Sequence, residues 1–116
     1  EDDPRVREFS VSALQGLGYT VLPYAGGEEA LSALENDART VDLLLTDVIL
    51  PGMNGRVLAE AVQKIRPGVK VLFASGYTDN IIVRHGVLEE GIHFIGKPFS
   101  VHALARKIRE VLDHRA

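Results

Sequence analysis

The chain contains no cysteine in its 116 residues. Disulfide bonds and thiolate-ligated zinc sites are therefore excluded. No apolar run approaches the ~20 residues that a membrane-spanning helix needs, and no signal peptide is visible. The formal net charge of -3 argues against a nucleic-acid surface, which needs a basic patch. We therefore expect a cytoplasmic protein with no direct contact with nucleic acid or a membrane.

Hydrophobic residues make up 46% of the chain and charged residues make up 25%. This balance is typical of a soluble globular protein. A length of 116 residues corresponds to one domain with one core, so we expect residues 1–116 to form a single unit.

The stretch from Leu43 to Gly55 organises the chain. It begins as an apolar run, which predicts a strand over 41–46 that is buried on both faces. It ends in proline, glycine and asparagine residues, which are typical of a turn. Asp47 lies where the strand ends, and ligands of open α/β sheets bind at that end of the strands. Asp47 is therefore a candidate site residue, although a lone aspartate there could also be a loop acid or a helix cap.

The rest of the chain alternates between strand patterns and helix patterns. The strands are predicted over 19–24, 41–46, 69–74 and 92–95, and the helices over about 4–17, 28–37, 57–65, 79–89 and 101–112. Asp3 and Ser100 are expected to cap the first and last helices, and Gly18 to end the first one. The helix over 57–65 carries an apolar stripe that begins at Val57. This alternation predicts a parallel sheet with helices on both faces. Pro23 cannot donate to a strand ladder, so we expect the strand over 19–24 to lie at an edge of the sheet.

Polar side chains occur at four points where strands are expected to end, namely Glu1 with Asp2, Asp47, Ser75 and Lys97. Right-handed crossovers bring these points to one edge of the sheet. Carboxylates held close together repel each other, and Mg²⁺ relieves the repulsion because it prefers oxygen ligands. An aspartate can also accept a phosphoryl group, and an ammonium or a hydroxyl can stabilise its oxygens. Taken alone, each of these residues is better explained as a turn, surface or helix-start residue, and only the combination favours a site.

Taken together, these segments resemble the receiver domain of two-component response regulators. The matching segments are residues 1–4, 47–55, 74–77 and 97–99, and the resemblance covers essentially the whole chain. It implies a flavodoxin-like three-layer α/β sandwich with a parallel sheet of strand order 2-1-3-4-5. In the family an apolar strand precedes the acid pair. That first strand is missing here, so we expect the given chain to lack its native start.

The resemblance implies a magnesium site around a phosphoacceptor. Asp47 corresponds to the phosphoacceptor, and Asp2 corresponds to the main magnesium-binding acid. Glu1 corresponds to the second acid, which often acts through water, and the backbone carbonyl of Ile49 would complete the protein ligands. Glu1 replaces the commoner aspartate, so its longer side chain puts direct metal contact in question.

The resemblance also implies a switch. Ser75 corresponds to the switch hydroxyl, Phe94 to the coupled aromatic residue and Lys97 to the lysine that pairs with the phosphoryl group. The Lys97–Pro98 peptide is expected to be cis. Ile49 and Tyr77 flank the expected phosphoryl group without offering a carboxamide or an acid to orient water, so we expect a fairly long-lived aspartyl phosphate.

The implied function is a phosphorylatable signalling switch and not a turnover enzyme. A histidine kinase or a histidine phosphotransfer domain would donate to Asp47 with Mg²⁺. The surface of the fourth helix, last strand and last helix would then change. The resemblance fits a hybrid histidine kinase or a free-standing receiver, and it allows a homodimer through the last two helices.

Two alternatives stay open from the sequence, and a third lacks the motif that it needs. A receiver-like binding module that is not phosphorylated would keep the fold. An aspartyl-phosphate hydrolase of the haloacid-dehalogenase type would want a second acid where Ile49 stands. A dinucleotide-binding domain would need a glycine-rich turn after its first strand, and residues 1–4 contain no glycine.

Overall fold

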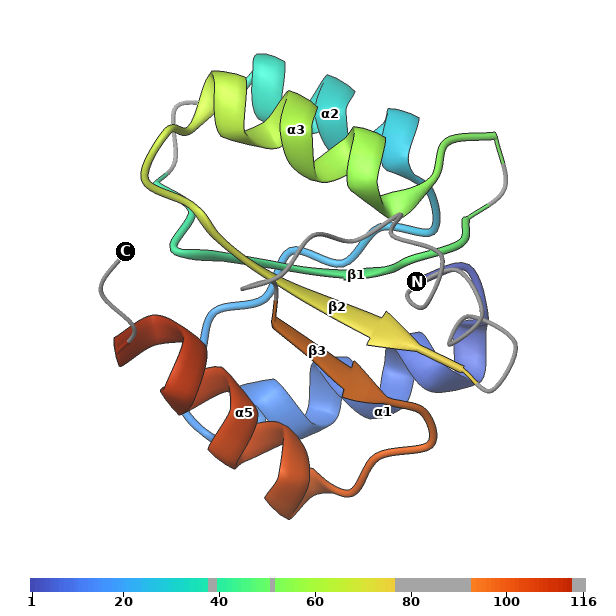
Figure 1. The fold of residues 1–116 in the computed structure, drawn as a ribbon, viewed down its shortest axis with the longest axis vertical. Helices are drawn as coiled ribbons and strands as arrows, with labels where there is room; N and C mark the ends of the chain where they lie inside the picture. The colour runs from blue at the N-terminus through green and yellow to red at the C-terminus, as the bar shows by residue number, and fades with distance from the viewer. Residues whose placement is uncertain (38–39, 51, 77–92, 114–116) are drawn as a thin grey trace.

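The computed structural model describes residues 1–37, 40–50, 52–76 and 93–113. The elements in this part of the chain are the helices α1 (Pro4–Gly16), α2 (Gly27–Glu35), α3 (Gly55–Ile65) and α5 (Val101–Asp113) and the strands β1 (Leu43–Asp47), β2 (Lys70–Ser75) and β3 (His93–Gly96). The sheet lies between two helical layers, with α2 and α3 over one face and α1 and α5 over the other (Figure 1). The predicted α/β layering is therefore present.

The three described strands form a parallel sheet in the order β1-β2-β3. Asp47 at the end of β1 is in register with Ala74 of β2, and Ser75 at the end of β2 is in register with Gly96 of β3. This order agrees with the 3-4-5 part of the predicted sheet. The carboxyl ends of all three strands point to one edge, which is also the edge where the N-terminus lies (Figure 1).

Side chains of the strands alternate between two cores, because successive residues of a strand point to opposite faces. Leu72, Ala74 and Ile95 pack against buried residues of α1 and α5, whereas Phe73 packs with Val48 and with Ala59 of α3. The core side chains that are almost completely buried include those of Leu72, Val62, Leu104 and Val111. β1 was predicted to be buried on both faces, and it does pack on both, since Leu43 and Leu45 join one core and Leu44 joins the other, but these three leucines are only partly buried.

The predicted helix caps are confirmed for the first and last helices. The Asp3 carboxylate accepts a hydrogen bond from the Arg5 N–H at 2.9 Å, with proline in the first turn. The Ser100 hydroxyl accepts one from the Ala103 N–H at 3.0 Å. Gly18 follows α1 with a φ of +96°, in the left-handed region that favours glycine at this place. These caps satisfy backbone groups that a helix end would otherwise leave without a partner.

Two predictions about secondary structure and burial are wrong. Residues 19–24 are not in a strand, because a strand needs a neighbouring backbone to pair with and the described residues provide none there. Val57 belongs to the apolar stripe predicted for α3, but it is 46% exposed, whereas Ala59, which lies outside that stripe, is buried. The helix predicted over 79–89 lies outside the described residues.

The start of α3 lies against the backbone of Asp47, and Gly55 makes this approach possible. A Cβ atom added at Gly55 would lie 1.9 Å from the Asp47 carbonyl oxygen and 3.0 Å from its carbonyl carbon. Both atoms belong to the backbone at the end of β1, so neither can rotate away. The absence of a side chain here sets the distance between α3 and the end of β1.

We expect Gly55→Ala to destabilise the fold by about 2–3 kcal/mol, because overpacking against fixed backbone forces a shift of the helix. The matched control is Gly16→Ala in α1, where an added Cβ meets nothing within 4 Å. That control should stabilise by about 0.5 kcal/mol through helix propensity. Urea unfolding of both variants measures the difference, and a neutral Gly55→Ala variant would contradict the contact.

Candidate functional site

The candidate site is built at the carboxyl edge of the sheet from three separate parts of the chain. Asp47 is the last residue of β1, Lys97 follows the end of β3, and Glu1 and Asp2 precede the Asp3 cap of α1. Parallel strands bring their carboxyl ends to one edge, which is why residues so far apart in sequence meet here. The Lys97–Pro98 peptide is cis, as predicted.

Lys97 is the centre of an ion-pair network at this edge. Its ammonium nitrogen lies 2.7 Å from Oδ1 of Asp47 and 3.1 Å from Oε1 of Glu1. The Asp47 side chain is 4% exposed and that of Lys97 is 24% exposed. The Asp47 contact is therefore nearly closed to solvent, whereas the Lys97 amine can still be approached from outside.

Glu1 is held in place by its neighbours. Its Oε2 accepts a hydrogen bond from the Asp3 N–H at 3.0 Å, while its backbone carbonyl accepts one from Arg7 at 2.9 Å. Its backbone nitrogen donates to the Tyr24 carbonyl at 3.3 Å. The Glu1 carboxylate is therefore directed at Lys97 and Asp47 by the same turn that begins α1.

The three carboxylates of the site lie close enough to share one cation. Glu1, Asp2 and Asp47 each offer an oxygen, and these oxygens lie within 4.8 Å of one another. Asp47 is buried, Glu1 is half-buried and Asp2 is exposed. Hard cations such as Mg²⁺ take carboxylate oxygens and keep several waters, so one buried and one exposed side of the site suit such an ion. The residues present therefore fit a magnesium ion.

Because the carboxylates are crowded, the pKa values of Asp47 and Glu1 shift in opposite directions. Burial, together with the hydrogen bond that the protonated Asp47 carboxyl donates to Glu1, raises the pKa of Asp47 to about 7, although Lys97 acts in the opposite direction. Burial also opposes ionisation of Glu1, but hydrogen bonds from Asp47, the Asp3 backbone and Lys97 outweigh it and lower its pKa to about 2. The two carboxyl groups thus share one proton, as expected for like charges that cannot both ionise without a cation.

The structure brings together four of the predicted site residues, Glu1, Asp2, Asp47 and Lys97. Ile49 lies in the bend two residues after Asp47, with its side chain 49% exposed. Ser75 ends β2 at the same edge, but the placement of its hydroxyl lies outside the described part of the structure.

Phe94 lies within β3 and is 42% exposed. Its side chain is therefore open to solvent on the outer edge of the described sheet.

Two features of the site were not predicted from the sequence. Lys97 was expected to meet a phosphoryl group, whereas here it pairs directly with two carboxylates. Thr46 was treated as an ordinary strand residue, but it is a buried polar side chain beside Asp47. A hydroxyl within an apolar strand is the signal that could have found it.

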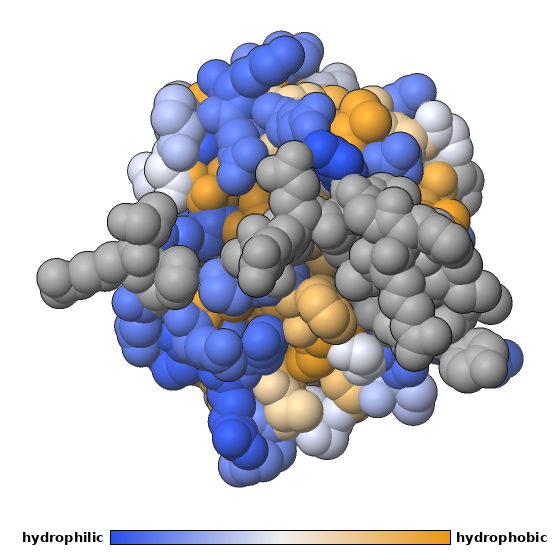
Figure 2. Space-filling view, in the orientation of Figure 1, coloured by the Kyte–Doolittle hydropathy of each residue, from blue (hydrophilic) through white to orange (hydrophobic). Residues whose placement is uncertain are grey.

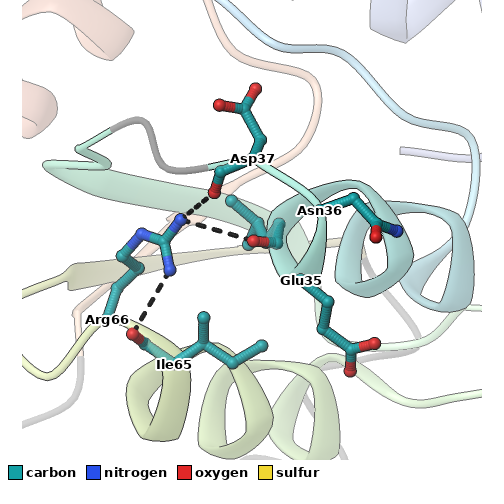
Figure 3. A pocket seen from close by; sticks show the side chains of 6 residues that line it. Glu35, Asn36, Asp37, Ile65 and Arg66 are labelled. Carbon is teal, nitrogen blue, oxygen red and sulfur yellow. Dashed lines mark hydrogen bonds between the residues drawn. The ribbon is translucent and has the colours of Figure 1, made fainter.

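A hollow on the surface lies apart from these residues, at the carboxyl end of α2. Residues 34–37 and 65–66 line it, and Arg66 extends across it (Figure 3). The Arg66 guanidinium donates to the carbonyls of Leu34 and Ile65 at 3.3 Å each and also to that of Asp37. Arg66 therefore binds the carbonyls at the end of α2, which is a structural role.

The outer surfaces of the helical layers are largely hydrophilic in the view of Figure 2, over α2 and α3 at the top and over α5 at the lower left. A smaller hydrophobic area lies at the lower centre of the same view. Within the described ranges, none of the helices is long and apolar enough to cross a membrane.

A family model described as "Response regulator receiver domain" matches residues 1–109 of the chain. Among curated proteins, the chain is 38% identical over 113 residues to the sensor kinase CckA of Brucella abortus, covering 97% of this chain and 12% of CckA. It is 31% identical over 112 residues to the response regulator receiver protein CpdR of the same organism, covering 97% of this chain and 92% of CpdR. The chain thus spans nearly all of one relative and a small part of the other.

Solved structures give the same result. The chain is similar to the receiver domain of the hybrid histidine kinase CckA, with a TM-score of 0.79, 34% identity and coverage of 97% of this chain and 94% of that one. A response regulator receiver protein from Sinorhizobium medicae has a TM-score of 0.83 at 21% identity, covering 100% of this chain and 92% of that one, which shows likeness of fold. The predicted flavodoxin-like fold class is thereby confirmed.

The proton held by Asp47 predicts a pH dependence of stability without metal. The folded chain keeps this proton to about pH 7, whereas an unfolded aspartate loses it near about pH 4. The folded state binds more protons between these values, so the free energy of unfolding should fall as pH rises through this range, by up to roughly 4 kcal/mol. The lowered pKa of Glu1 acts in a separate window, because its stabilisation is lost only as pH falls toward about 2.

Asp47→Asn should reduce the loss of unfolding free energy with rising pH, because an amide does not titrate. Urea unfolding in EDTA at several pH values measures it for both proteins. If the free energy of unfolding falls equally with pH in wild type and variant, the titrating proton is not on Asp47.

Proposed function

Because this chain belongs to the response regulator receiver domain family, as the resemblance predicted, we propose that it is a signalling switch phosphorylated on Asp47. The observation that carries the proposal is the contact between Lys97 and Asp47, 2.7 Å long and nearly buried, inside a group of three carboxylates. A buried acid beside an ammonium and a cation-binding group has the components that phosphoryl transfer needs.

The transfer itself requires an ionised Asp47. One Asp47 carboxylate oxygen attacks the phosphorus of a phosphohistidine, a P–O bond forms and the P–N bond of the donor breaks. The imidazole leaves and takes up a proton from water, so the product is an acyl phosphate and a neutral histidine. Lys97 lies close enough to Asp47 to neutralise charge on the phosphoryl oxygens, because its amine already contacts the accepting carboxylate.

We assign the cation to Asp2, Asp47, Glu1 and the backbone carbonyl of Ile49. When bound, Mg²⁺ neutralises charge on the carboxylates and on the incoming phosphoryl group. Asp2 is the most exposed of the three acids, whereas the Glu1 carboxylate also contacts the Lys97 amine and accepts a hydrogen bond from the Asp3 N–H. Loss of the shared proton accompanies formation of the loaded site, since both inner carboxylates must then ionise.

The remaining parts of the switch follow from family membership. Ser75 is proposed as the hydroxyl that moves toward the phosphoryl group and Phe94 as the aromatic residue that responds. Phe94 is 42% exposed, so it has room to change its packing. The predicted surface of the fourth helix, and a homodimer through the last two helices, involve residues outside the described part of the chain.

The phosphoryl donor is proposed to be a histidine kinase or a histidine phosphotransfer domain. Similarity to the sensor kinase CckA at 38% identity, against 31% for CpdR, favours a hybrid kinase as the parent protein over a free-standing regulator. Residues 1–116 would then form its receiver domain.

Phosphorylation of the purified chain tests the proposal. With acetyl phosphate and Mg²⁺, intact-mass spectrometry should show one added phosphoryl group in wild type and none in Asp47→Ala or after EDTA. Asp42→Asn is the matched control, since Asp42 is an exposed acid just before the other end of β1. Failure of wild type to take up phosphoryl or to bind beryllofluoride would support the binding module that is not phosphorylated.

We expect the phosphoryl group to be long-lived, because Ile49 offers no hydrogen-bonding group to orient an attacking water. Ile49→Asn should shorten the half-life of the phosphorylated protein several-fold, since a carboxamide can position water beside the phosphoryl group. The decay is followed by mass spectrometry after removal of the donor. Val57→Asn, an equally exposed apolar position on α3, should decay like wild type, and slower decay in Ile49→Asn would contradict the idea.

A further inference from the structure

Thr46 is an unusual residue for its place in the fold. It stands within β1 between apolar residues and Asp47, and its relative exposure is 3%. Within the described ranges, Thr46 and Asp47 are the two polar residues that are buried. A buried hydroxyl is costly unless it has a partner, so its partner indicates what it does.

The partner is the backbone of Asp47. The Thr46 hydroxyl donates to the Asp47 carbonyl oxygen at 3.1 Å. The other end of the same peptide unit, the N–H of Val48, donates to the carbonyl of Ala74 in β2, also at 3.1 Å. The Asp47–Val48 peptide is therefore held at both ends, by a side chain of β1 and by the neighbouring strand.

A third contact limits movement of the same peptide. An added Cβ at Gly55 would reach the Asp47 carbonyl oxygen, so the backbone of α3 already lies directly against it. The Gly55 N–H donates to the Val48 carbonyl at 2.8 Å, which fixes the next peptide as well. Strand, hydroxyl and helix together leave this carbonyl little room to tilt.

The orientation of this peptide sets the direction of two groups of the site. Rotation about the Cα–C bond of Asp47 changes where its carboxylate points relative to Lys97. It also changes the path of the bend that presents Ile49. We propose that Thr46 is a positioning residue, which holds the Asp47 carboxylate in line for phosphoryl attack through its hydrogen bond to the Asp47 carbonyl. This inference rests on the proposed function of Asp47.

The test compares Thr46→Val, which keeps the shape and removes the hydroxyl, with Thr46→Ser, which keeps the hydroxyl. Initial rates of phosphorylation are measured over a range of acetyl phosphate concentrations with saturating Mg²⁺ and corrected for the folded fraction. Thr46→Val should lower the maximal rate about tenfold with little change in the half-saturating concentration, because misplacement of a reacting group reduces the rate and not the binding. Thr46→Ser should restore most of it.

Val62→Ala is the control for simple destabilisation, because Val62 is fully buried in α3 and takes no part in the site. It should lower the melting temperature and leave the corrected maximal rate unchanged. If Thr46→Val has the wild-type maximal rate, or if Thr46→Ser is as slow as Thr46→Val, the positioning role is overturned. If Thr46→Val does not fold, Thr46→Ala is compared with Thr46→Ser by the same criteria.

The result is distinguishable from failure of the proposed function. If wild type itself takes up no phosphoryl group, both the proposed function of Asp47 and the positioning role of Thr46 are contradicted. If wild type is phosphorylated and the two Thr46 variants match it, Thr46 alone is overturned.

Discussion

The contact between Lys97 and the buried carboxylate of Asp47 is the interaction on which the site depends. A charge at Asp47 is costly inside the fold, and Glu1 beside it increases the cost. Lys97 offsets part of this cost, and the raised pKa of Asp47 shows that the charged form remains disfavoured. The site therefore suits a bound cation, because a cation neutralises the carboxylate charge that the fold must otherwise hold.

This balance requires a rigid backbone around Asp47. The end of β1 is fixed by pairing with β2, by the Thr46 hydroxyl and by the close approach of α3 at Gly55. Hydrogen bonds and packing of this kind reduce the reorganisation needed when charge arrives. By contrast, Asp2 and Ile49 lie toward solvent, so the outer side of the site stays open.

Much of the fold was predictable because short-range rules determine it. Helix caps at Asp3 and Ser100 and the packing of β1 on both faces follow from local chemistry and periodicity, and they were found as predicted. Residues 19–24 were predicted as a strand from composition, but strand formation requires a partner distant in sequence. Val57 was assigned to the buried stripe by its apolar side chain, yet the direction in which α3 faces the sheet is set by packing.

The amino-acid sequence by itself determined the class of the fold, the order of its elements and the residue types at the strand ends, since periodicity, turns and motifs are local. It therefore pointed to Asp47 and Lys97 as members of one site. Only the tertiary structure decided that Lys97 binds Glu1 and Asp47 directly, that one proton is shared between those carboxylates and that Thr46 holds the Asp47 backbone. Distances, burial and charge coupling arise between residues far apart in the chain or from the packing around them, and no local pattern encodes them.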